Sequence, residues 1–317
     1  MPVFSRKHFC ADGSMLLLLA LGGSGLLLWS EAVSAAMTQA VTLCINVLLP
    51  SLFPFFVLSS TLTSSGILQR TSSVLDRPVR WLFDLPGPCA AAILLGAVGG
   101  YPVGAKTASA LYSQGSCSKE DALRTLRFCN NAGPAFLISA VGSGLLHNKS
   151  LGIFLYGIHL ISALLIGLIF RENSTTVKSC FITGKKSIPE PFSSVFLQSV
   201  TGSFAAFLNV CSFVLLFAVL LCLLSQLPLL KTLSPLPHGL LCGILELTSG
   251  TAVLAASGLS LRVLLTALSF LCGFGGLSVQ LQTIRFLQDA GLPCRDHLRF
   301  KLLHGCLAAL LTFVLYR

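Results

Sequence analysis

The stretch Gly99-Gly100-Tyr101-Pro102-Val103-Gly104-Ala105-Lys106 interrupts an apolar run that extends from Cys89 to Tyr112. Paired glycines and a proline break a helix, and each backbone group left unpaired in lipid costs several kcal/mol. Such a break persists only where it faces protein or a water-filled cavity. Cys89–Tyr112 is therefore either a hairpin that returns to the same side of the membrane or a broken segment that crosses it, and the distribution of basic residues favours the hairpin.

The whole chain has the composition of a membrane protein. Of its 317 residues, 54% are hydrophobic and 10% are charged, against about 25% charged in a soluble domain. This excludes a soluble enzyme and a disordered scaffold. The other apolar stretches of near-spanning length are Met15–Trp29, Ala36–Ser65, Phe128–Leu146, Leu151–Phe170, Leu197–Leu227, Leu240–Leu259, Val263–Gln282 and Leu302–Tyr316. They predict an all-α polytopic membrane protein. The first stretch also fits a signal peptide, but the many spans after it favour an uncleaved helix.

Basic residues set the orientation, because cytoplasmic loops carry an excess of Lys and Arg. We assume a cytoplasmic N-terminus and take Cys89–Tyr112 and Leu240–Leu259 as re-entrant. The cytoplasmic segments then hold Arg6, Lys7, Arg70, Arg77, Arg80, Lys119, Arg124, Arg127, Arg171, Lys178, Lys185, Lys186, Arg285, Arg295, Arg299 and Lys301, and the other side holds Lys149, Lys231, Arg262 and Arg317. The net charge of +10 therefore indicates topology, and no nucleic acid partner is expected.

The same arrangement divides the chain into two halves in which the helix breaks occur in the same order. Each half reads as a span, a hairpin and two further spans, and the two hairpins enter from opposite sides. We predict a first span over 1–35, a first repeat over 36–170, a polar linker over 171–196 and a second, inverted repeat over 197–317. Inverted repeats with re-entrant or broken helical hairpins are typical of secondary transporters, whose binding sites lie near the midplane.

Four breaks supply the candidate binding residues: Gly99–Lys106, Cys129–Pro134, Glu246–Gly250 and Gly273–Gln280. A half-helix that begins at a break directs backbone N–H groups and a positive dipole end at an anion. The alternative is that the glycines only allow close helix packing. The candidate substrate-binding residues are Tyr101, Gly104, Lys106, Asn130, Asn131, Glu246, Thr248, Ser249, Gly275, Gly276, Ser278 and Gln280.

Two of these candidates are ionisable. Lys106 would either neutralise an anionic substrate or extend to the cytoplasmic interface. Glu246 would bind substrate, a coupling cation or a proton, or would be a structural partner of Thr248, Ser249 or a helix end.

Four further residues have simpler interpretations. His159 and His304 lie on spans, where a lone histidine is more often a hydrogen-bonded core residue than a ligand. Arg124 and Arg127 are expected to be topology determinants near the cytoplasmic entry.

Motifs for other chemistries are absent from the sequence, which contains neither H-E-x-x-H nor G-x-S-x-G. Gly99–Thr107 approaches a P-loop, but it has one residue too many and contains Pro102. The 12 cysteines form no C-x-x-C pair, and those within apolar runs fit small hydrophobic side chains. We expect no catalytic residue, no metal and no cofactor, and hence no enzyme.

Five ordered motifs resemble the YlbJ-type sporulation integral membrane proteins. They are Leu49–Phe56, Gly100–Lys106, Phe128–Phe136, Leu245–Gly250 and Gly273–Gln280, and the resemblance runs from about Ala36 to Tyr316. It implies a nucleoside-recognition or gate-type domain, distantly similar to concentrative nucleoside transporters. It also implies a role in endospore formation, in which relatives move dipicolinic acid across the outer forespore membrane.

A small rigid dianion such as dipicolinate suits half-helix N-termini, paired amides and a membrane lysine. We expect a secondary carrier in a multi-pass bacterial cell membrane, with substrate between the hairpins on Asn130, Asn131, Ser278 and Gln280, and with Lys106 balancing its charge. Transport of nucleosides or other polar metabolites is one alternative, and a structural role in assembling the spore membrane is another. The lipid bilayer is the second expected partner, and self-association into a homo-oligomer stays open.

Overall fold

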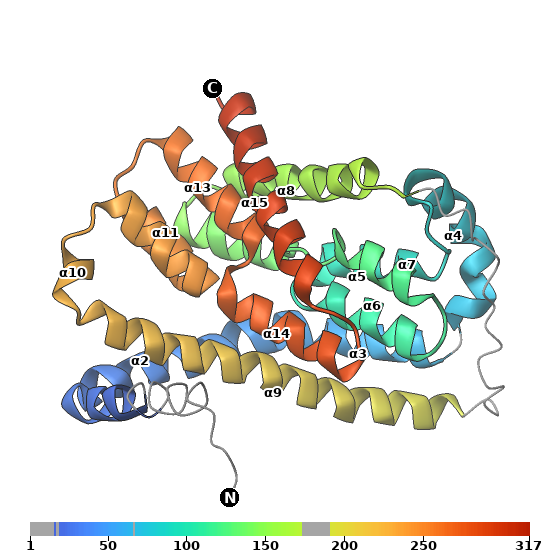
Figure 1. Ribbon diagram of the computed structural model, residues 1–317, viewed down its shortest axis with the longest axis horizontal. Coiled ribbons are helices and arrows are strands. Elements are labelled where there is room, and N and C mark those ends of the chain that lie inside the picture. The colour runs from blue at the N-terminus through green and yellow to red at the C-terminus, as the bar shows by residue number, and fades with distance from the viewer. Residues whose placement is uncertain (1–15, 17–18, 66, 173–190) are drawn as a thin grey trace, which may run out of the picture.

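A computed structural model describes residues 16, 19–65, 67–172 and 191–317 (Figure 1). Every regular element in these residues is a helix, which confirms the predicted all-α class. The start of the predicted first span and most of the predicted linker over 171–196 lie outside the described residues.

The first half contains α2 (Ser30–Leu43), the π-helix η1 (Cys44–Leu48), α3 (Leu49–Ser64), α4 (Ile67–Phe83), α5 (Cys89–Gly99), α6 (Val103–Ser113), α7 (Lys119–Leu126), the π-helix η2 (Ala135–Leu145) and α8 (Lys149–Ile169). The π-turns of η1 stand just before Pro50. A proline has no N–H to donate and crowds the preceding turn, and the wider π geometry accommodates this change of register. Pro54 lies inside α3.

The second half contains α9 (Phe192–Ser225), α10 (Pro228–Lys231), α11 (Pro235–Leu245), α12 (Leu247–Ala255), α13 (Leu261–Phe274), α14 (Gly276–Asp289) and α15 (Arg295–Leu315). The 34 residues of α9 make a helix about 51 Å long, which exceeds a hydrocarbon core of about 30 Å. Figure 1 shows α9 running along one whole side of the molecule. This helix therefore tilts in the bilayer or extends beyond it.

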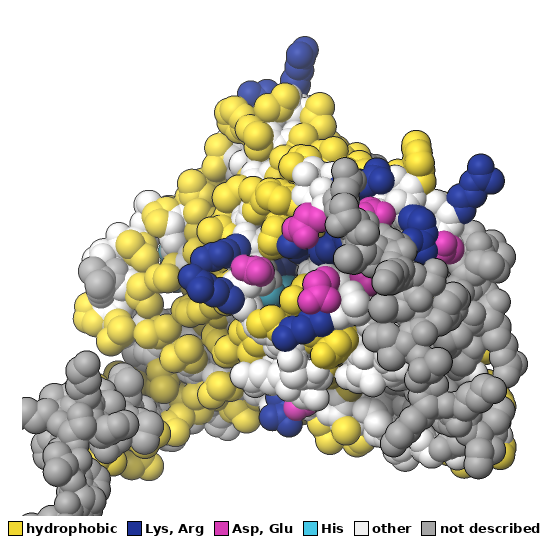
Figure 2. All heavy atoms as spheres, turned by 45° about the vertical axis from the view of Figure 1, so that its right-hand side comes forward, with side chains coloured by type: hydrophobic (Ala, Val, Ile, Leu, Met, Phe, Trp, Pro, Cys, Tyr) yellow, Lys and Arg dark blue, Asp and Glu magenta, His cyan; other side chains and the backbone are white. Residues whose placement is uncertain are grey.

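Four helical stretches of the described chain are long and apolar enough to cross a membrane: Lys149–Ile169, Phe192–Ser225, Leu261–Asp289 and Arg295–Leu315. A fifth span results if Leu19–Leu28 and Ser30–Asn46, which meet at 93°, count as one broken span. The protein is thus an integral, multi-pass membrane protein. Figure 2 shows acidic and basic side chains gathered on one face, beside a surface that is largely hydrophobic.

Two antiparallel hairpins stand in the predicted places. A Cβ added to Gly250 of α12 would lie 2.0 Å from Gly243 Cα of α11, and one added to Gly96 of α5 would lie 2.9 Å from Gly104 Cα of α6. An 11-residue helix such as α5 or α11 is about 16 Å long, too short to cross the hydrocarbon. Broken helical hairpins are therefore confirmed, while entry from opposite sides stays a prediction.

The α13–α14 stretch is the centre of the fold, because 78% of its most apolar window is buried. The predicted span Val263–Gln282 is in fact these two helices, joined at Gly275 and continuing to Asp289. α13 packs against α15 where Gly273 meets Gly305, a Cβ on Gly273 being 2.6 Å from Gly305 Cα. The first half has a break at the corresponding place, since residues 127–134 separate α7 from η2.

Candidate substrate site

The four predicted breaks meet at the centre of the molecule. A Cβ added to Gly100 would lie 2.9 Å from Gly133 N, so the tip of the α5–α6 hairpin packs on the extended segment before η2. A Cβ on Gly276 would lie 2.9 Å from Gly243 O and 3.0 Å from Leu247 N, so the α13–α14 junction packs on the second hairpin. These contacts need glycine, since Gly100 and Gly276 have φ values of +80° and +73°.

Tyr101 joins the two pairs of breaks. Its Cζ lies 3.4 Å from a Cβ added to Gly275, and its hydroxyl donates a hydrogen bond to Cys272 O on α13. Asn130 makes a second link between the halves, because its Nδ2 donates to Thr283 Oγ1 on α14 at 2.9 Å. The structure therefore brings together predicted residues that lie more than a hundred positions apart in the chain.

Lys301 of α15 lies at this junction and is 1% exposed. Its Nζ donates to Asn130 O at 2.7 Å and to His304 Nδ1 at 3.0 Å, and it lies 5.1 Å from the centroid of the Tyr101 ring. Among the described residues, no carboxylate lies within ion-pair distance of Nζ. The centre thus contains an ammonium group whose charge no described side chain neutralises.

Hydrogen bonds assign the tautomers of the two histidines beside Lys301. His304 Nε2 lies 3.0 Å from His159 O, a carbonyl that can only accept, so Nε2 carries the proton and Nδ1 accepts from Lys301. His159 Nε2 accepts from Ala132 N at 2.9 Å, so its proton is on Nδ1. That Nδ1–H has no partner among the described residues. Both histidines are hydrogen-bonded core residues, as expected, and they also surround Lys301.

Four predicted polar residues have buried side-chain oxygens that find no partner in the part of the chain that the structure describes: Asn130 Oδ1, Asn131 Oδ1, Ser278 Oγ and Gln280 Oε1. The amide nitrogens each donate one hydrogen bond, from Asn131 Nδ2 to Phe128 O at 2.9 Å and from Gln280 Nε2 to Phe274 O. Buried polar atoms are nearly always hydrogen-bonded. These unpartnered oxygens, on the segment before η2 and in the first turns of α14, therefore indicate places for a ligand or for water.

Glu246 has a local role in the structure. Its carboxylate accepts from Thr248 N at 3.0 Å and from Ser249 N at 2.7 Å, and the residue is 4% exposed. It is thus the N-cap of α12, which agrees with the structural alternative. Because this carboxylate already occupies the helix N-terminus, that terminus does not offer its first N–H groups to a substrate anion.

Lys106 and Gly104 contact neighbouring segments. Lys106 Nζ donates to Ser60 Oγ of α3 at 2.9 Å and lies 4.7 Å from the centroid of the Phe56 ring. A Cβ on Gly104 would lie 2.1 Å from Cys129 O, so this glycine permits close packing of α6 on the extended segment. In this conformation, then, Lys106 lies against α3, while Lys301 is hydrogen-bonded within the central junction.

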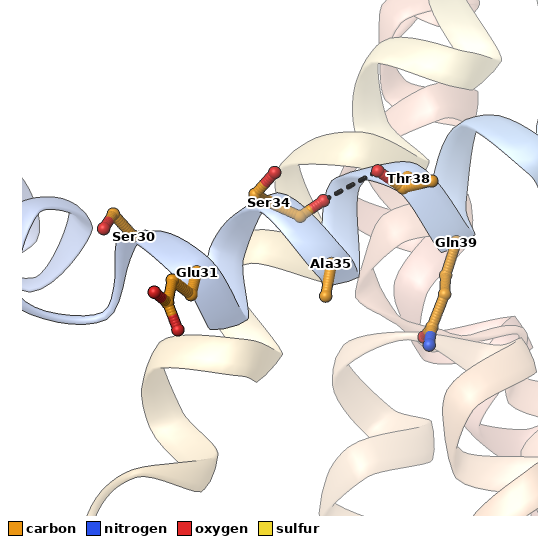
Figure 3. A pocket seen from close by; sticks show the side chains of 6 residues that line it. All are labelled: Ser30, Glu31, Ser34, Ala35, Thr38 and Gln39. Carbon is orange, nitrogen blue, oxygen red and sulfur yellow. Dashed lines mark hydrogen bonds between the residues drawn. The ribbon is translucent and has the colours of Figure 1, made fainter.

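Two hollows lie beside these elements. One, of about 440 Å³, lies between α2, α9, α11 and α12, and Glu246, Thr248 and Ser249 are part of its lining. Figure 3 shows the other, an open hollow along α2 lined by Ser30, Glu31, Ser34, Ala35, Thr38 and Gln39. There Thr38 Oγ1 donates to Ser34 O at 2.9 Å, an ordinary contact within one helix. The second hollow is thus a feature of the helix surface.

Two basic residues that the positive-inside rule assigns to cytoplasmic segments have buried side chains in the structure. Lys301 is the first. Arg124 is the second: its Nη2 donates to Phe83 O at 2.9 Å and to Asp84 O at 2.8 Å, which satisfies carbonyls at the end of α4. Arg127 pairs with Glu172 at 2.7 Å in a more exposed position. Lys301 and Arg124 thus bond within the protein, and their cytoplasmic position stays a prediction.

A periodic pattern in α15 could have revealed Lys301. One face of that helix is buried along its length. It carries His297, Lys301, His304, Ala308 and Thr312, which follow one another at intervals of three or four, together with Gly305. Side chains with this spacing share one face of a helix. Polar residues on a stripe opposite exposed Leu302 and Leu310 indicate a helix whose inner face meets other polar groups.

Comparisons with known proteins show the family of this chain. A family model described as "Gate: Nucleoside recognition" matches residues 45–172, the part that contains Tyr101, Asn130 and Asn131. The sporulation integral membrane protein YlbJ of Bacillus subtilis (strain 168) is 30% identical over 305 residues, with 86% of this chain and 74% of that protein covered. The chain belongs to the YlbJ family. No solved structure matches it significantly.

Membership of the YlbJ family confirms the resemblance read from the five motifs. In this YlbJ-family chain, the central groups can bind an anion through the remaining N–H of Lys301 and the free Nδ1–H of His159. Amide nitrogens can join them, because an Asn or Gln side chain offers donors or acceptors according to how it is turned. All of these groups are buried, so the conformation described here is closed around them.

Proposed function

We propose that this protein is a secondary carrier of a small organic anion, and that the anion is dipicolinate during endospore formation. The observation that carries the proposal is Lys301, which is buried against Asn130 and Tyr101 of two backbone breaks, without a described carboxylate beside it. An uncompensated charge in a low-dielectric interior is costly. A substrate anion would supply the missing partner.

Dipicolinate has two carboxylates on a rigid ring, and the centre offers two kinds of donor. One carboxylate would accept from Lys301 Nζ in a charge-assisted bond. The other would accept from His159 Nδ1–H or from the turned amides of Asn131 and Gln280, whose oxygens lack partners now. Tyr101, which contacts both Gly275 and Lys301, would cover the ring.

The name of the Bacillus subtilis relative supports the setting in endospore formation. We place the carrier in the bacterial cell membrane, and in the outer forespore membrane when the host sporulates. Expression of this chain in Bacillus subtilis lacking YlbJ tests the setting. Restored sporulation is the expected result, and an unchanged defect despite membrane insertion would contradict it.

A nucleoside is the second candidate substrate, favoured by the description of the matching family model. The buried amide oxygens of Asn130, Asn131 and Gln280 could accept N–H groups of a base. This candidate leaves the charge of Lys301 uncompensated, and for that reason it comes second.

Uptake into proteoliposomes distinguishes the candidates. Purified protein is reconstituted and loaded with unlabelled dipicolinate, and entry of labelled dipicolinate is followed with and without excess nucleoside. We expect exchange that excess nucleoside does not reduce. Exchange of nucleosides alone would reverse the choice of substrate, and no exchange of either by folded protein would favour the structural role in membrane assembly.

A further inference from the structure

We infer that Lys301 is also the site of the coupling proton, which is loaded with the anion and released with it, so that the carrier is a proton symporter. This inference rests on the proposed function. It concerns the pair Lys301–His304, whose direct contact the transport of an anion does not by itself require.

The pair has the geometry of a proton donor and its acceptor. Lys301 Nζ lies 3.0 Å from His304 Nδ1, and the fixed tautomer of His304 leaves a lone pair on that nitrogen. Both residues are on the buried stripe of α15, three positions apart. A lysine that only attracted an anion would not need an imidazole lone pair held against it.

Lys301 sets the charge of this centre, because no carboxylate among the described residues faces it. The titratable groups that face it are His297 and His304 on its own helix, His159 on α8, Tyr101 at the first hairpin, Cys129 before η2 and Cys272 on α13. None is a carboxylate, and no described ion pair includes Lys301. Loss of one proton from the Lys301–His304 pair would therefore remove the charge that holds the substrate.

The proton step balances without another reactant. An N–H bond of the Lys301 ammonium breaks, its electron pair stays on Nζ, and a new N–H bond forms at His304 Nδ1. His304 becomes an imidazolium that keeps its Nε2–H on His159 O. When the site opens, the imidazolium gives the proton to water and returns to its present tautomer.

Binding of the proton and of the anion must then be linked in both directions. A positive Lys301 raises affinity for the anion, and by thermodynamic reciprocity the bound anion raises the affinity of Lys301 for its proton. Loss of either the proton or the anion weakens binding of the other, so both are released on the same side of the membrane. This linkage predicts symport rather than exchange of an anion for a proton.

The test uses reconstituted full-length protein with dipicolinate as the probe and with the membrane potential clamped at zero. An outside pH one unit below the inside should drive dipicolinate inward, about tenfold in accumulation for each coupled proton, since one pH unit is a tenfold change in proton activity. A pH-sensitive dye inside the vesicles should report acidification when a dipicolinate gradient is applied.

Two variants separate the charge of Lys301 from its ability to release a proton. Lys301→Arg keeps a cation that does not deprotonate, so it should exchange dipicolinate but lose accumulation driven by pH. His304→Asn keeps an acceptor near Lys301 but cannot take the proton, so it should show the same loss of accumulation. This second variant keeps the test decisive where the larger arginine does not fit. Lys149→Arg, on the exposed start of α8, is the matched control and should behave as wild type.

The outcomes separate this inference from the function on which it rests. Wild-type protein that exchanges dipicolinate but ignores the pH gradient would overturn proton coupling and leave the carrier intact. Full accumulation by Lys301→Arg and His304→Asn would overturn the assignment of the proton to this pair. Wild-type protein that neither binds nor exchanges dipicolinate would contradict the proposed substrate itself.

Discussion

A single ammonium group on α15 sets the chemistry of the centre. Lys301 donates to the backbone of one half of the protein, at Asn130 O, while its own helix belongs to the other half. Its contact with the Tyr101 ring adds a cation–π interaction. Lys301, which supplies the positive charge of the candidate site, thus also links the two halves.

Glu246 is the residue whose role the structure changes most. Glu246→Ala removes the acceptor of Thr248 N and Ser249 N and should cost about 1 kcal/mol of stability, as for other N-caps. Glu246→Gln keeps one acceptor oxygen and should cost less. We expect uptake per folded molecule to stay at the wild-type level in Glu246→Gln, measured beside the melting temperature in detergent.

Asn148→Ala is the control for Glu246, since Asn148 caps α8 through Ser150 N and Leu151 N at an exposed site. It should lower the melting temperature by a similar amount. If Glu246→Gln still exchanged substrate but failed at uptake driven by pH, Glu246 would carry the coupling proton, and the assignment to Lys301 would be wrong.

Asp76 of α4, outside the candidate spans, gives a prediction for pH. Its hydrogen bonds with Arg80 and with Gly87 N hold the pKa of its carboxyl below the usual value. A lowered pKa in the folded state contributes stability above the unfolded pKa near 3.9, and this is lost as the pH falls through the folded pKa. The pair is 37% and 36% exposed, so solvent screening keeps the contribution below about 1 kcal/mol.

Asp76→Asn should therefore lower the melting temperature at pH 7 by a few degrees at most. The difference from wild type should shrink as the pH falls below about 4. A difference that stays constant down to pH 2.5 or so would show that the charge of Asp76 is not responsible.

The elements of this fold are held together by backbone contacts at glycines. Hairpin α5–α6 packs on the segment before η2, and hairpin α11–α12 packs on the α13–α14 junction. Small residues let helix backbones approach closely in membranes, where association relies on packing. The same glycines that break the helices therefore also assemble the halves, so both interpretations of the breaks apply.

Gly104→Ala tests this packing. Its Cβ would lie 2.1 Å from Cys129 O, a backbone atom that cannot move alone, and such overpacking typically costs about 1–3 kcal/mol. We expect a lower melting temperature and weaker dipicolinate binding, because Cys129 precedes Asn130. Gly202→Ala in α9 meets nothing within 4 Å and should be neutral or stabilising. Equal behaviour of the two variants would contradict the packing account.

The elements were predictable from sequence to the extent that glycine and proline mark breaks. The breaks arise from the local backbone at Gly100 and Pro102 and at Gly275 and Gly276, so the sequence alone is enough to predict them. Lys301 was missed because Arg295 and Arg299 precede it, and a basic run beside a span is typical of a cytoplasmic loop. Its burial depends on which face of α15 meets α8 and α13, and that is a property of tertiary packing.

At the scale of the whole molecule, the central question is how the two halves sit in the bilayer. Their elements follow the same order, and each has a hairpin, a broken stretch and a final helix. The final helices α8 and α15 carry His159 and His304, whose ring centroids are 4.5 Å apart. The division into repeats at 36–170 and 197–317, with opposite orientation, is our interpretation of this order.

Cysteine labelling tests the orientation in a background without the 12 native cysteines. Single cysteines in Arg77–Asp84, Ser116–Asp121 and Thr176–Lys185, the last outside the described residues, should react from the cytoplasm. Ser260→Cys, after the second hairpin, should react from the outside. Labelling of Ser116–Asp121 from the outside would mean that the first hairpin crosses completely, and the inverted repeat would not hold.

The claim that an anion binds at Lys301 is tested most directly by ligand-induced thermal stabilisation of the purified protein. Dipicolinate that binds only the folded state must raise the melting temperature as its concentration rises. We predict this rise for wild type and for Lys149→Met, no rise for Lys301→Met, and none for wild type with nucleosides. A Lys301→Met variant that folds and is stabilised by dipicolinate as strongly as wild type would contradict the account.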